Sequence, residues 1–84
     1  MTPLTSTFTA SPDGVLTAEV GVISGELELQ TSLADDGALT LAIRYAGAAE
    51  WYHLPGEDYR LHDLRDHDTL HRVLVNVLQR PAAA

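Results

Sequence analysis

The chain has 84 residues, which is enough for one small domain and leaves no room for a second. It contains no cysteine, so disulfide bonds, thiolate metal ligands and a cysteine nucleophile are all excluded. The net charge of −7 is uneven, because residues 1–43 hold six acidic residues and no basic one. Without a cluster of Lys or Arg we expect no nucleic-acid partner, whereas an acidic surface suits solubility or a basic protein partner.

All five basic residues are arginine, and together with the many Ala, Leu, Val, Asp and Gly residues this is typical of a GC-rich bacterial genome. Residues 1–14 have neither the positive region nor the apolar run of a signal peptide. No stretch approaches the roughly 18 apolar residues of a transmembrane helix. We therefore expect a cytoplasmic protein without a membrane partner.

The first two-thirds of the chain alternates polar and apolar residues with period two, which is typical of antiparallel strands. Short turn segments such as 11–14 and 34–37 interrupt the alternation. In the second predicted strand Leu16, Ala18, Val20 and Val22 share one face and are expected to point into the core. The predicted strands span residues 4–10, 15–23, 26–33, 38–45 and 49–54.

The last third changes period. An apolar stripe at i, i+3, i+4, i+7 and i+8 predicts an amphipathic helix over 67–80, which Pro81 ends. The stripe consists of Leu70, Val73, Leu74, Val77 and Leu78. The predicted fold class is therefore α+β: a five-stranded antiparallel β-meander with one C-terminal helix packed on one face. Residues 1–80 form the single domain, and 81–84 are expected to be a frayed tail.

The predicted helix is too narrow for the predicted sheet. Five strands spaced about 4.8 Å apart make a face roughly 24 Å wide, whereas a helix with its side chains is about 10 Å across. The rest of that face needs curling of the sheet, cover from segment 55–66 through Tyr59, Leu61 and Leu64, or a second copy of the chain. A homodimer is therefore a possible state of this protein.

Three histidines gather at the start of the predicted helix, and His67 and His71 are four residues apart, on one helical face. With Asp68 they resemble the H-E-x-x-H zinc-protease motif, but aspartate is one methylene shorter than glutamate. We expect instead that Asp66 or Asp68 caps the helix and that both histidines face solvent. No metal or other cofactor is predicted; if a metal bound, His67 and His71 would be its ligands, with His62 or Asp63 as a third.

Aromatic residues cluster in the last predicted strand, at residues 51–54. Because side chains alternate, Trp51 and His53 face one way and Tyr52 and Leu54 the other, so one pair joins the core. An exposed aromatic pair is a candidate interaction hot spot. We name Trp51 and Tyr52 as candidate interaction residues, against the alternative of an edge strand with an aromatic core anchor.

The outer face of the predicted sheet is acidic and rich in threonine, and could dock a basic partner by charge complementarity. An ordinary antiparallel sheet with one wet face has the same pattern. Glu19, Glu26 and Glu28 are its candidate interaction residues. The predicted face comprises Thr5, Thr7, Thr9, Thr17, Glu19, Glu26, Glu28, Gln30 and Thr40.

No nucleophile elbow or phosphate-binding loop occurs, and we do not expect an enzyme. The first functional hypothesis is a small acidic, non-catalytic protein-interaction or accessory domain of a bacterial system that associates with itself. The second is an immunity- or antitoxin-like inhibitor that binds a basic partner through its acidic sheet face. The third is a small metal-binding protein that uses His67 and His71.

Overall fold

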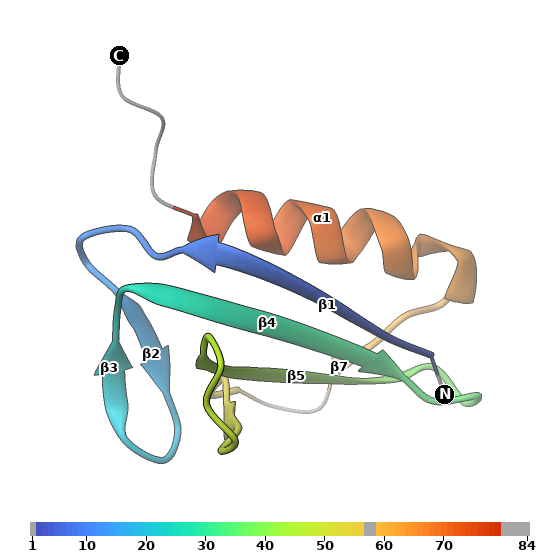
Figure 1. Ribbon diagram of the computed structural model, residues 1–84. Coiled ribbons are helices and arrows are strands. Elements are labelled where there is room, and N and C mark those ends of the chain that lie inside the picture. The colour runs from blue at the N-terminus through green and yellow to red at the C-terminus, as the bar shows by residue number, and fades with distance from the viewer. Residues whose placement is uncertain (1, 57–58, 80–84) are drawn as a thin grey trace.

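A computed structural model describes residues 2–56 and 59–79 of the chain (Figure 1). The predicted α+β class, with a mainly antiparallel sheet and one C-terminal helix, is confirmed. One sheet has the strand order β1-β4-β5-β6, with β7 also pairing β5, and β2 and β3 form a separate two-stranded sheet. The strands are β1 (Thr2–Thr9), β2 (Val15–Thr17), β3 (Gly21–Ile23), β4 (Glu26–Leu33), β5 (Ala38–Tyr45), β6 (Tyr52–His53) and β7 (Tyr59–Arg60).

Strand β4 is an inner strand of the larger sheet and shows the clearest alternation. It pairs antiparallel with β1 on one side and with β5 on the other. Leu27, Leu29, Thr31 and Leu33 are all buried on its inner face, while the residues between them are more exposed. The neighbouring β1 carries Ser6 directly opposite Leu29, so that its side chain belongs to the same inner face. Ser6 and Thr31 therefore place hydroxyl groups among the apolar side chains of the inner face.

Segment 15–23 is a hairpin and not the single strand that the alternation predicts. Thr17 and Gly21 are paired across a turn in which Val20 N–H donates to Thr17 Oγ1 (3.2 Å) and that hydroxyl donates to Gly21 O (2.6 Å). Gly21 has φ +79°, which favours glycine at the end of such a turn. Because this segment turns back on itself, β1 pairs with β4 and the hairpin lies outside the larger sheet.

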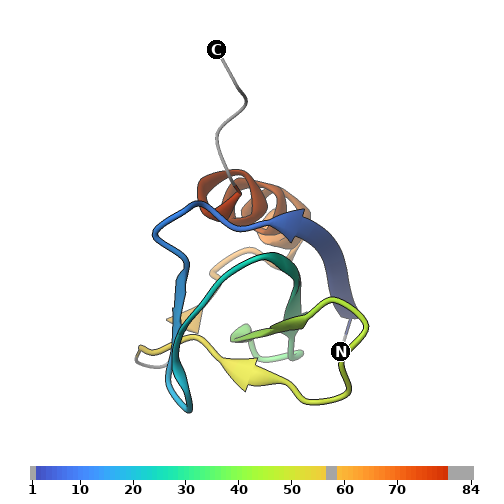
Figure 2. The same ribbon diagram turned by 60° about the vertical axis from the view of Figure 1, so that its left-hand side comes forward.

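The wide inner face is closed by curvature and by the hairpin. In Figure 2 the strands curve around a common interior, with the helix on one side of it. Val15 and Ile23 of the hairpin join the buried cluster that also contains Phe8, Leu27 and Ile43. Of the segment predicted to help, Leu61 is half-buried, whereas Tyr59 and Leu64 are 44% and 46% exposed.

The helical segment begins with a short 3-10 turn, η1 (Leu64–Asp66), and continues as α1 (His67–Leu78). Asp66 holds the N-cap position of α1, but its side chain makes no capping hydrogen bond. Asp68 is not the cap either, because it lies inside the first turn of the helix. Asp63 caps the preceding η1 instead, by accepting from Arg65 N–H (2.9 Å). Residue 80 and the predicted tail 81–84 lie outside the described residues, and within those residues no helix has the length and apolarity to cross a membrane.

Candidate functional site

Two buried histidines of α1 meet two hydroxyl groups of the sheet. Thr31 Oγ1 lies 2.8 Å from His67 Nε2 and 2.8 Å from His71 Nδ1. The other ring nitrogen of His71, Nε2, lies 2.8 Å from Ser6 Oγ. Thr31 is fully buried, and His67 and His71 are only 6% and 4% exposed. We call this group of Ser6, Thr31, His67 and His71 the histidine chain.

The spacing of residues in three elements builds this chain. His67 and His71 are separated by one turn of helix and therefore point the same way from α1. Thr31 in β4 and Ser6 in β1 both belong to the inner face of the sheet, which the helix covers. Buried hydroxyls and imidazoles need partners, so helix and sheet satisfy each other's polar groups. The prediction that the two histidines face solvent is wrong.

The environment of the histidine chain disfavours positive charge. Burial lowers the pKa of His71, and the nearby His67 lowers it further. The carboxylate of Asp68 acts in the opposite direction and raises the pKa of His71, but it is the smallest of the three effects. Neutral imidazole is therefore the favoured form of His71 at neutral pH.

Turning the histidines inward leaves part of the apolar stripe of α1 outside. Val73 is 51% and Val77 is 70% exposed, whereas Leu74 and Leu78 pack against the core. A groove of about 330 Å³ lies between α1 on one side and β5 and β7 on the other. We call Val73 and Val77 the helix patch. The groove is lined by Leu39, Leu41, Tyr59, Arg60, Leu61, Leu70 and Leu74.

The β2–β3 hairpin shows the same inversion. Leu16, Val20 and Val22, which the alternation places in the core, are 56%, 54% and 61% exposed. Leu16 and Val22 are opposite each other across the hairpin, so their side chains share one face. Thr17 is buried instead, at 3% exposure. We call Leu16, Val20 and Val22 the hairpin patch.

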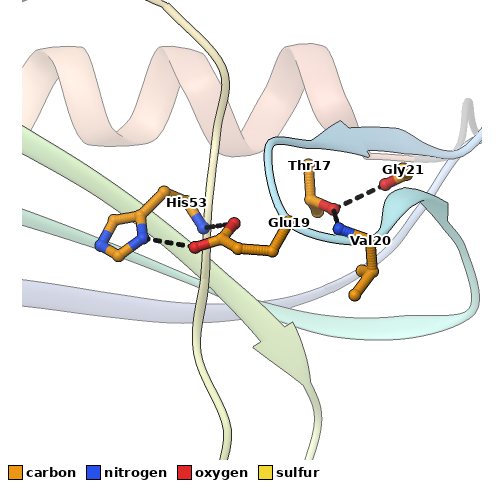
Figure 3. A network of polar contacts seen from close by, with 5 residues as sticks. All are labelled: Thr17, Glu19, Val20, Gly21 and His53. Carbon is orange, nitrogen blue, oxygen red and sulfur yellow. Dashed lines mark hydrogen bonds and ion pairs between the residues drawn. The ribbon is translucent and has the colours of Figure 1, made fainter.

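Glu19 is not on the acidic sheet face, and neither is Thr17; both of these predictions are wrong. Glu19 belongs to the hairpin turn and binds His53 of β6 (Figure 3). Its carboxylate accepts from His53 N–H (2.8 Å) and lies 2.7 Å from His53 Nδ1. The side-chain hydrogen bond and then the backbone hydrogen bond from His53 lower the pKa of Glu19. Together with the bond from Ala18 N–H to His53 O (2.8 Å), this contact attaches the hairpin to β6.

The other acidic candidates lie on the outer face of the larger sheet, and they have partners within the chain. Glu28 accepts from Arg44 Nε (3.0 Å), which lowers the pKa of Glu28. Glu26 accepts a hydrogen bond from Thr9 Oγ1 (3.2 Å) and is exposed. The guanidinium of Arg44 also stacks on Trp51, 4.3 Å from the ring centroid.

The aromatic segment divides as the alternation requires. Tyr52 and Leu54 pack against the core, so they are the inward pair. Trp51 is half-buried beneath Arg44, and His53 contacts Glu19. Both aromatic residues therefore make contacts within the fold: Tyr52 packs against the core and Trp51 stacks with Arg44.

The structure does not unite the three candidate metal ligands. His62 is exposed, whereas His67 and His71 hydrogen-bond to Thr31. In the part of the chain that the structure describes, no group of three or more His, Asp or Glu side chains has the arrangement of a metal site.

The comparisons with known proteins give no relative: no family model matches the chain, and neither a curated protein nor a solved structure does.

Proposed function

We propose that this chain is a non-catalytic protein-interaction module that associates with itself through the hairpin patch and the helix patch. The observation that carries the proposal is the shared inversion of two elements. The hairpin buries Thr17 and exposes Leu16 and Val22, and α1 buries its histidines and exposes Val73 and Val77. Exposed aliphatic side chains that lie together on a surface are typical of protein-binding sites.

The hairpin patch keeps apolar surface that a partner could bury. Complete burial of a valine or leucine side chain contributes about 1.5–3 kcal/mol. The three residues of the hairpin patch are each slightly more than half exposed, so covering them would add about 1 kcal/mol per residue. Such a contribution matters for a small domain whose own core is modest. A second copy carries the same patches and therefore offers apolar surface of the same kind.

The other two hypotheses have less support. For an inhibitor that acts through its acidic face, Glu19 and Glu28 would be needed to bind a basic partner, yet each is already paired with a basic side chain of this chain. For a metal-binding protein, His71 would have to give up one of its two hydroxyl partners, because both of its ring nitrogens are hydrogen-bonded, and His67 would lose Thr31 if it bound the metal through Nε2.

The test is the solution mass of the full chain, measured by light scattering on a sizing column over a wide concentration range. We expect a dimer that dissociates on dilution. The double variants Leu16→Ser/Val22→Ser and Val73→Ser/Val77→Ser should each shift the chain toward monomer without loss of its circular dichroism. Leu64→Ser is the matched control, because Leu64 is exposed but belongs to neither patch.

A chain that stays monomeric at all concentrations would overturn the proposed self-association. A dimer that neither double variant weakens would overturn the assignment of the two patches.

A further inference from the structure

The histidine chain has a limited number of hydrogen atoms to share, and this limits its protonation. A threonine hydroxyl has one hydrogen, so Thr31 can donate to only one of the two imidazoles that contact it. When both histidines are neutral, one contacting nitrogen donates to Thr31 and the other accepts from it. Every contact is then a hydrogen bond, and Ser6 completes the chain at His71 Nε2.

One additional proton is compatible with the same geometry. If His71 is the protonated ring, its Nδ1–H donates to Thr31 and its Nε2–H donates to Ser6. The Thr31 hydroxyl then donates to the unprotonated Nε2 of His67. No hydrogen bond is lost, and the cost is that of a single buried charge.

A second proton is not compatible. With both imidazoles charged, both contacting N–H groups point at Thr31 Oγ1, and the hydroxyl hydrogen loses its acceptor among these partners. Two positive charges then share one fully buried oxygen. Buried like charges this close repel strongly because little water screens them.

The charged groups nearby do little to neutralise a second charge. On α1, Asp68 lies one residue from His67 but is paired with Arg72 (3.3 Å) and exposed. Strand β1 contributes no titratable side chain, and in η1 Arg65 is bound to Asp63 while Asp66 is exposed. The carboxylates of β4 are on the opposite face of the sheet: Glu26 and Glu28.

We propose that the histidine chain is an acid-sensitive latch, which holds α1 on the sheet with zero or one bound proton and releases the helix when both histidines become charged. Release of α1 would uncover the inner face at Thr31 and Leu29, which the closed domain keeps out of water. The latch would therefore make the exposure of this face depend on pH. This inference rests on the buried contacts of α1 and is independent of the proposed self-association.

The first experiment measures the ring nitrogens of all four histidines by NMR in the full chain from pH 7.5 to 5.0. We expect at most one proton to be taken up by His67 and His71 together while the α1 amides remain protected from hydrogen exchange. If both rings become fully charged and the α1 amides stay protected, the latch does not exist.

The second experiment measures the opening of α1 from its amide exchange rates, corrected for the intrinsic effect of pH. If the closed state excludes one proton that the open state binds, the opening constant should rise about tenfold for each pH unit below the usual histidine pKa of about 6.5. His67→Gln keeps a polar group at the Nε2 position but cannot become charged, so its opening constant should rise less steeply than that of the wild type as the pH falls; the dependence that remains comes from the burial that lowers the pKa of His71. The control is His62→Gln, which changes an exposed histidine and should keep the wild-type dependence.

An opening constant of the wild type that does not change between pH 7.5 and 5.0 would refute the latch. Equal pH dependence in His67→Gln and His62→Gln would also refute it. If His67→Gln does not fold, the ring titration of the wild-type chain still decides the matter.

Discussion

Thr31→Val tests the histidine chain at neutral pH by removing the one hydroxyl that both imidazoles share. Valine keeps the branched shape of threonine, so the packing of a fully buried side chain is nearly preserved. The change leaves His67 Nε2 and His71 Nδ1 without the partner that lies 2.8 Å from each of them.

The expected loss follows from these two orphaned nitrogens. Each buried polar group left unpaired costs about 1–3 kcal/mol. The new methyl group returns up to about 1 kcal/mol, because it is apolar and stays out of water. Thr31→Val should therefore lower the free energy of unfolding by about 1–5 kcal/mol, a large fraction of the total for a small domain.

The assay is urea unfolding at pH 7.5 followed by circular dichroism. Thr7→Val is the matched control: Thr7 is exposed in β1, and the same substitution there should change the free energy of unfolding by less than about 0.5 kcal/mol. A Thr31→Val variant as stable as the wild type would show that the two contacts contribute nothing to the docking of the helix.

Two further predictions concern a turn and an ion pair. Gly37 has φ +92° and a Cβ there would lie 2.7 Å from Leu61 O, whereas at Gly47 (φ +81°) nothing lies within 4 Å of such a Cβ. In urea unfolding, Gly37→Ala should therefore lower the free energy of unfolding by at least about 1 kcal/mol more than Gly47→Ala does. Equal losses in the two variants would show that the contact with Leu61 is loose. Because the hydrogen bonds from His53 lower the pKa of Glu19, the stabilisation from that contact is complete above the usual glutamate pKa and is lost as the pH falls through the lowered value. The difference in unfolding free energy between the wild type and Glu19→Gln should accordingly shrink between pH 5.5 and 3, and a constant difference would contradict the assignment.

The sequence predicts the three long strands of the larger sheet, because polar and apolar residues largely alternate along them, but not the pairing of β1 with β4. The hairpin was harder to predict, since Val15 and Leu16 are adjacent apolar residues and either could have faced the core. Four apolar residues at even positions favoured the wrong face. The turn at 18–20 and the positive φ of Gly21 determine how β2 pairs with β3. A polar–apolar alternation that continues through the turn does not reveal it.

The orientation of α1 had a signal in the sequence that periodicity alone does not weigh. The apolar rows of β1 and β4 are interrupted at Ser6 and Thr31, which stand at inward positions of otherwise apolar faces. A helix that presents His67 and His71 one turn apart matches two such hydroxyls. The apolar stripe of the helix predicts that Val73 and Val77 are buried, because hydrophobic periodicity ignores the hydrogen bonds that a buried polar pair can make.

One measurement tests the central claim, that α1 and the hairpin turn polar side chains inward and keep aliphatic ones for a partner. It is the line broadening of valine and leucine methyl groups by a soluble paramagnetic probe, in dilute and in concentrated samples of the full chain. We predict that Val22, Val73 and Val77 are strongly broadened in dilute solution and become protected at high concentration, whereas Leu29 is protected in both. Protection of these valines in the dilute sample would contradict the account of the fold, and broadening that does not change with concentration would contradict the account of self-association.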